Sequence, residues 1–172
     1  MDEKPLWYDL RRKDETVCER DREVDFDYKE YEEKCDRIRE ENERLIEIFE
    51  RDLSGFSDRT VKRHISNVDF YINVFLLRED AVPFQEGVWR INEFLGDFFI
   101  RKCAWSTPQT IRSTAASIKK FYKSMAEHGK IRKEDYHSVC EEIKESIEEW
   151  QNLCAIYNNP KAVNPFNFFS FF

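Results

Sequence analysis

The sequence predicts an all-α protein, a helical bundle of about five helices. Charged residues make up 37% of the 172-residue chain and glycine occurs only four times, a pairing that favours long amphipathic helices over strands. Apolar residues also recur at intervals of three and four along five segments. Fifteen Phe, seven Tyr and four Trp supply large side chains for a core. A chain of this length fits one domain.

The pattern divides the chain into three parts. We expect a charged, loosely ordered arm over residues 1–30, a helical bundle over residues 31–157 and a Phe-rich tail over residues 158–172. The first expected helix runs from about Tyr31 to Leu53 and ends before a Ser-Gly break. Ser57 is placed to cap the second helix. The apolar stripe of that helix steps by four and three through Val61, Ile65, Val68, Ile72 and Phe75.

Three further helices are expected after a break at residues 79–83. The third runs from about Phe84 to Lys102. Ser106 or Thr107 caps the fourth, which has Pro108 in its first turn and ends before Gly129, a residue suited to a left-handed stop. The fifth is an acidic helix over residues 133–157.

Several function classes lack their residue patterns. The chain contains no C-x-x-C pair and no phosphate-cradling glycine loop, so we expect no metal and no cofactor. No nucleophile, base and orienting group can be assembled, so we expect no enzyme. The five scattered cysteines fit reduced thiols better than disulfides. No apolar run reaches the roughly 20 residues of a membrane span, and the start lacks a signal-peptide pattern, so we expect a cytoplasmic protein without a membrane contact.

The net charge of -7 hides an asymmetry along the chain. Residues 1–53 carry 12 Lys/Arg against 20 Asp/Glu, residues 54–131 carry 12 against 8, and residues 132–172 carry 4 against 7. Only the middle part is therefore basic. Within it, Arg112, Ala116, Lys119 and Lys123 step by four, three and four, which places three cations and one small residue on one helix face. Such a stripe suits phosphate binding, although basic stripes are common on helices and, on charge alone, a solvated helix face is the favoured explanation.

Two segments of this basic part resemble a known family. LSGFSDRTVKRHISNVDFYINVFL resembles the opening of the core-binding domain of tyrosine recombinases and phage integrases, and WSTPQTIRSTAASIKKFYKSMAEHGKI is similar to the last helix of that domain. The resemblance covers about residues 40–131. It implies a SAM-like four-helix unit, to which residues 133–157 add an extra C-terminal helix, and it implies that the second and fourth helices clamp double-stranded DNA.

The resemblance nominates DNA-binding residues by position. Its cations would hold phosphates, and residues near the start of the fourth helix would meet base edges. The nominated residues are Arg59, Lys62, Arg63, Gln109, Thr110, Arg112, Lys119, Lys120 and Lys123. The catalytic half of the family carries a His-x-x-Arg motif, but none of the three histidines here is followed three places on by Arg. We therefore expect binding without strand cleavage.

The alternative is a protein-interaction or homo-oligomerisation module. Five Phe in the last seven residues form either a groove filler that folds back onto the helices or a docking peptide for a second copy or another protein. The acidic helices and Trp150 would supply the matching surface. The residues of this partner-binding alternative are Trp150, Phe166, Phe168, Phe169, Phe171 and Phe172.

Overall fold

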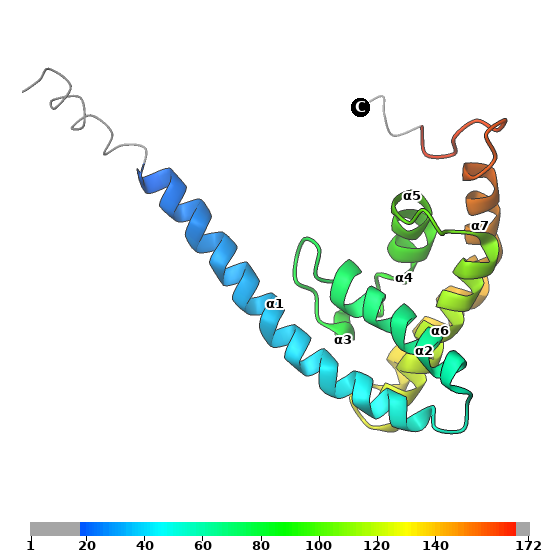
Figure 1. Ribbon diagram of the computed structural model, residues 1–172, viewed down its shortest axis with the longest axis horizontal. Coiled ribbons are helices and arrows are strands. Elements are labelled where there is room, and N and C mark those ends of the chain that lie inside the picture. Colours follow the sequence, from blue (N-terminus) through cyan, green and yellow to red (C-terminus); the bar gives the residue numbers. More distant parts are fainter. Residues whose placement is uncertain (1–17, 168–172) are drawn as a thin grey trace, which may run out of the picture.

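Helices and their connecting turns make up the described part of the chain. A computed structural model describes the backbone of residues 18–167 and the side chains of residues 27–167, and no strand occurs in this part. The expected all-α fold is confirmed (Figure 1). The α-helices are α1 (Cys18–Asp52), α2 (Asp58–Asp69), α3 (Phe84–Gly87), α4 (Ile91–Glu93), α5 (Phe99–Lys102), α6 (Pro108–Glu127) and α7 (Lys133–Tyr157).

The first helix is longer than predicted. It begins at Cys18 rather than near Tyr31, so residues 18–30 are helical and not a loose arm; residues 1–17 lie outside the described part. Figure 1 shows α1 extending well away from the other helices. The middle of α1 packs against the loop before α3. Cys35 is buried with Leu77 and Ala81 of that loop, and the Tyr31 hydroxyl donates a hydrogen bond to the Leu77 carbonyl. A search for periodic apolar residues does not detect a helical segment in which charged residues predominate.

Local capping sets the starts of α2 and α6 as the sequence predicts. The Ser57 hydroxyl accepts a hydrogen bond from the Thr60 N–H, and α2 continues into a π-helical segment, Phe70–Phe75. Thr107, rather than Ser106, caps α6 and forms a capping box with Thr110. Gly129 has a φ of +65°, which confirms the left-handed stop after α6.

The expected third helix is broken into pieces. Residues 88–90 separate α3 from α4, and a π-helical segment, Phe94–Phe98, separates α4 from α5. The cause is tertiary: the Tyr71 hydroxyl donates to the Gly87 carbonyl, and the Tyr122 hydroxyl donates to the Phe84 carbonyl at 2.7 Å. Both tyrosines are fully buried, so carbonyls of the α3 turn bond to side chains from other elements, although the Gly87 carbonyl also accepts from the Arg90 N–H at 2.9 Å.

One core joins these elements. The fully buried side chains include Phe49 of α1, Tyr71, Phe94, Phe121 of α6 and Trp150 of α7. Their rings meet at tilted and edge-to-face angles, as between Phe49 and Phe121, whose centroids lie 5.5 Å apart. The four cysteines with described side chains are free thiols. The core therefore consists of packed aromatic and aliphatic side chains.

We expect Gly87→Ala to destabilise the protein by about 1–3 kcal/mol, the usual cost of overpacking a core. A Cβ at this position would lie 2.6 Å from Leu76 Cδ1 and 2.7 Å from the Tyr122 hydroxyl oxygen. Chemical denaturation measures the free energy of unfolding. Gly55→Ala is the matched control, because a Cβ there meets nothing within 4 Å. Equal stability of the two variants would contradict this account of the α3 turn.

Candidate nucleic-acid interface

Helices α2 and α6 are joined by a buried polar contact. The Ser117 hydroxyl of α6 accepts a hydrogen bond from Asn67 Nδ2 at 3.0 Å and lies 2.8 Å from His64 Nδ1, both on α2. It donates to the Ser113 carbonyl at 3.0 Å, so Nδ1 of His64 is the donor in the His64–Ser117 bond. The two helices are thus locked together, and their outer sides form one surface.

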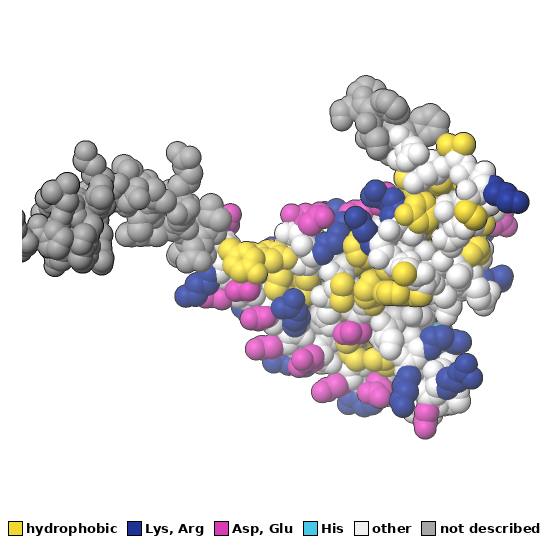
Figure 2. Space-filling model, turned by 45° about the horizontal axis from the view of Figure 1, so that its top comes forward, with side chains coloured by type: hydrophobic (Ala, Val, Ile, Leu, Met, Phe, Trp, Pro, Cys, Tyr) yellow, Lys and Arg dark blue, Asp and Glu magenta, His cyan; other side chains and the backbone are white. Residues whose placement is uncertain are grey.

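Seven of the nominated residues are the Lys and Arg residues of this surface. Residues 58–69 carry three cations against two carboxylates, and residues 108–127 carry four against one. All seven are exposed except Lys120, which is half-buried. We define the basic face as Arg59, Lys62, Arg63, Arg112, Lys119, Lys120 and Lys123. Figure 2 shows Lys and Arg side chains gathered at the lower right, where Figure 1 places the turn into α2.

The α6 stripe has the predicted geometry. Arg112, Ala116, Lys119 and Lys123 are all exposed, so one small residue separates cations on a single helix face. Among the described residues, no carboxylate lies within 4.0 Å of a basic-face cation except Glu127, which is 3.7 Å from Lys123. Most of the charge on the face is therefore free to meet an anionic ligand.

The residues nominated at the start of α6 divide into two kinds. Gln109 is exposed and available to a ligand. The Thr110 hydroxyl is engaged in the cap: it accepts from the Thr107 N–H at 2.8 Å and lies 3.2 Å from the Trp105 carbonyl oxygen. Thr110 thus has a structural role that the base-contact prediction did not include.

His64 lies directly beneath the basic face. Its side chain is buried between the rings of Phe49 and Phe56, with centroids 6.5 and 6.2 Å away. Burial lowers the pKa of His64 below its ordinary value, and the positive charges of Arg63 and Lys120 lower it further. The imidazole is consequently neutral near pH 7 and adds no charge to the face.

Acidic groups border the basic face on the side of α1. Asp52, the last residue of α1, accepts a hydrogen bond from the Ser124 hydroxyl at 2.6 Å and lies 3.0 Å from His128 Nε2. The Ser124 bond, helped by His128, lowers the pKa of Asp52 below its ordinary value although partial burial opposes this. Residues 18–52 carry eight cations against 15 carboxylates. The basic face is therefore bounded by negative charge.

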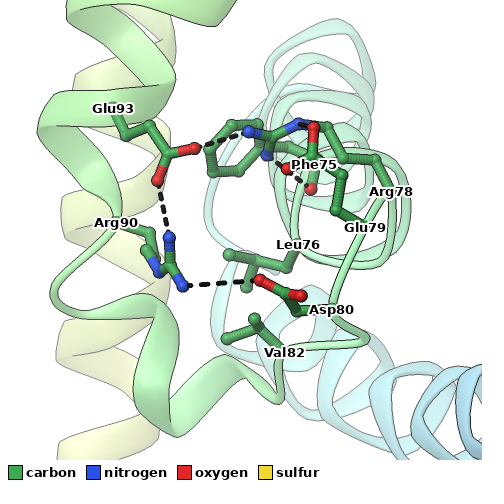
Figure 3. Close-up of a pocket in the computed structure, with 8 residues that line it drawn as sticks. All are labelled: Phe75, Leu76, Arg78, Glu79, Asp80, Val82, Arg90 and Glu93. Atoms are coloured by element: carbon green, nitrogen blue, oxygen red, sulfur yellow. Dashed lines mark hydrogen bonds and ion pairs between the residues drawn. The ribbon is translucent and has the colours of Figure 1, made fainter.

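A separate polar pocket lies between the loop before α3 and α4 (Figure 3). Glu93 binds Arg78 and, at 2.8 Å, Arg90, while Asp80 lies 3.8 Å from Arg90. Burial opposes ionisation of Glu93, but the hydrogen bonds from the two arginines outweigh it and lower the pKa of this carboxyl. The charged groups here satisfy one another, so this pocket serves to hold the loop that contacts α1.

The partner-binding residues are only partly available. Trp150 is 1% exposed, packs against Gly96 and donates from its indole nitrogen to Asn92 Oδ1 at 2.8 Å, so the prediction that Trp150 offers a docking surface is wrong. Phe166 is half-buried against the Tyr157 ring, 5.7 Å away between centroids. The other nominated phenylalanines, Phe168, Phe169, Phe171 and Phe172, lie outside the described residues.

Sequence reasoning missed two features of this surface. One is the contact of Ser117 with His64 and Asn67. The sequence pattern that could have indicated it is the pair of polar residues, His64 and Asn67, one turn apart beside the apolar stripe of α2. The other is Phe56, which is 46% exposed and places its ring centroid 4.8 Å from Lys120 Nζ. Its signal was an aromatic residue just before a helix cap, a position typical of a hydrophobic staple.

Comparisons with known proteins give no relatives. No family model matches the chain, and searches of curated proteins and of solved structures find no match. Within residues 18–167, no helix has the length and apolar character needed to cross a membrane. The same part of the chain holds no cluster of three or more His, Cys, Asp or Glu side chains that could bind a metal ion.

We expect the stability of the protein to fall between pH 7 and pH 5 because of His64. A histidine whose pKa is lower in the folded state stays neutral there while the unfolded chain takes up a proton below about pH 6.5, so folding is disfavoured as the pH falls. The measurement is the free energy of unfolding of the wild type minus that of His64→Gln at both pH values. This difference should be smaller at pH 5; a constant difference would contradict the assignment.

Proposed function

We propose that the protein binds DNA through the basic face and catalyses no reaction on it. The observation that carries this proposal is the packing of α2 against α6, which combines seven cations from two helices into one surface on a protein of net charge -7. Because the chain already carries a large negative net charge, the need for solubility does not explain a cluster of cations. A concentrated patch of positive charge attracts the phosphate backbone of a nucleic acid.

The dimensions of the face suit duplex DNA. Arg112 and Lys123 are 11 residues apart on α6, which corresponds to about 16 Å along a helix axis, more than the roughly 12 Å width of a major groove. The small side chain of Ala116 lets the helix approach the backbone closely. Cations on α2 lie alongside, so phosphates on both sides of the contact can be neutralised. Gln109 is the residue placed to reach a base edge.

The resemblance to integrase core-binding domains supports the same proposal. It nominates the second and fourth helices of the integrase-like unit, which are α2 and α6. Because the cations would mostly bind phosphates, the interface should tolerate many sequences and respond strongly to salt. The acidic border would confine the DNA to this one surface.

We expect the double variant Lys62→Glu/Lys119→Glu to weaken binding to a 20-base-pair duplex by about tenfold or more at roughly 50 mM salt, because each change replaces a phosphate partner with a repelling charge. Fluorescence anisotropy at roughly 50 and 200 mM salt gives the affinities. Wild-type binding should itself weaken steeply between the two salt concentrations.

The matched control is Lys133→Glu/Lys144→Glu, which makes the same change of net charge on exposed residues of α7. Thermal unfolding followed by circular dichroism shows whether each variant is folded. If both double variants bind equally well, the basic face is only a solvated surface and the proposal is wrong.

A further inference from the structure

Phe56 lies where the basic face meets the end of α1. It lies in the turn between α1 and α2, just before the Ser57 cap, and 46% of it is exposed. The Nζ atom of Lys120 lies 4.8 Å from the ring centroid, a cation–π distance, and the His64 ring meets it edge-to-face. An aromatic ring is therefore held in a fixed position beside Lys120 and His64, with much of its surface in solvent.

The ring separates two shallow hollows. Phe56, Val61 and Lys62 line one hollow between the end of α1 and the start of α2, together with Glu50, Ser54 and Asp58. Phe56, Lys120 and Lys123 line the other, between α1 and α6, together with the carboxylates Asp52 and Glu127. Each hollow thus combines the same phenylalanine with at least one lysine and two carboxylates, and a chain crossing the ridge would meet a cation on either side of the ring.

The contact of Phe56 with α2 does not by itself require an aromatic residue. A residue before a helix cap packs against the fourth helical residue, which is Val61 for α2, and any large apolar side chain can do so. Leucine would satisfy that contact. What phenylalanine adds is a flat π surface, which Lys120 already approaches.

We propose that Phe56 stacks on an unpaired nucleobase while Lys62 and Lys120 hold the phosphates on its two sides. Bases inside a duplex are covered on both faces by their neighbours, so only an unstacked base presents a face to a protein ring. The basic face therefore prefers DNA that contains unpaired bases over DNA that is fully paired. This inference rests on the proposed DNA binding and adds the form of DNA that is bound.

The test compares two probes that differ only in unpaired bases. One is a fully paired 20-base-pair duplex, and the other is the same duplex with three unpaired thymines at the centre of one strand. Wild-type protein should bind the bulged probe about tenfold more tightly, in line with the stacking of one base on an aromatic side chain. Anisotropy at roughly 50 mM salt measures both affinities.

Phe56→Leu should abolish this preference and keep the affinity for the paired duplex, because leucine retains the staple contact and loses the π surface. Phe56→Tyr, which keeps a ring, should restore the preference. Trp89→Leu is the matched control, since Trp89 is a 68% exposed aromatic residue outside α2 and α6. This control should behave like the wild type.

The outcomes separate the inference from the function on which it rests. Equal wild-type affinity for the two probes, or a preference that survives in Phe56→Leu, overturns the stacking role and leaves DNA binding in place. Loss of the preference in Trp89→Leu also overturns it. Failure of the wild type to bind either probe at low salt overturns the proposed function and this inference with it.

Discussion

The burial of α6 is the constraint on which the rest of the structure depends. This helix lies between α2 and α7, and its buried side includes three hydroxyl groups that each bind a different element. Ser117 binds α2, Tyr122 binds the α3 turn and Ser124 binds Asp52 at the end of α1. A buried hydroxyl left without a partner costs about 1–3 kcal/mol, so each bond fixes the position of its element as well as adding stability. No buried side-chain polar atom in the described part lacks a partner.

This arrangement also determines the character of the surface. Because one side of α6 is occupied by small and aromatic residues, the exposed remainder of the helix carries its cations, and the Ser117 contact aligns them with those of α2. Acidic residues dominate α1 and α7. At physiological ionic strength exposed charges are screened beyond about 8 Å, so the acidic helices limit the extent of the basic face without cancelling it. Net charge is consequently a poor guide to what this protein binds.

Sequence patterns predicted the features that depend on neighbouring residues. Ser57, Gly129 and the apolar stripe of α2 were all identifiable, because caps and helix periodicity act within one or two turns. The break at residues 88–90 was not, because it depends on hydroxyls of Tyr71 and Tyr122, the latter far away in sequence. Trp150 was assigned to the surface because a stripe shows which residues share a side, but does not show which neighbour covers them.

The candidate site follows the same division. Helix periodicity was enough to place Arg112, Lys119 and Lys123 on one exposed face, since their relation lies within α6. The relation of Lys120 to Phe56 and His64 joins α6 to the turn before α2, and only the packing of those elements reveals it. That packing keeps His64 neutral, because burial lowers the pKa of its imidazole and the positive charges of Arg63 and Lys120 lower it further. The ring of Phe56 therefore lies beside a neutral imidazole and 4.8 Å from Lys120 Nζ, and carboxylates as well as lysines line the hollows next to it, so that an uncharged nucleobase suits this position better than a phosphate does.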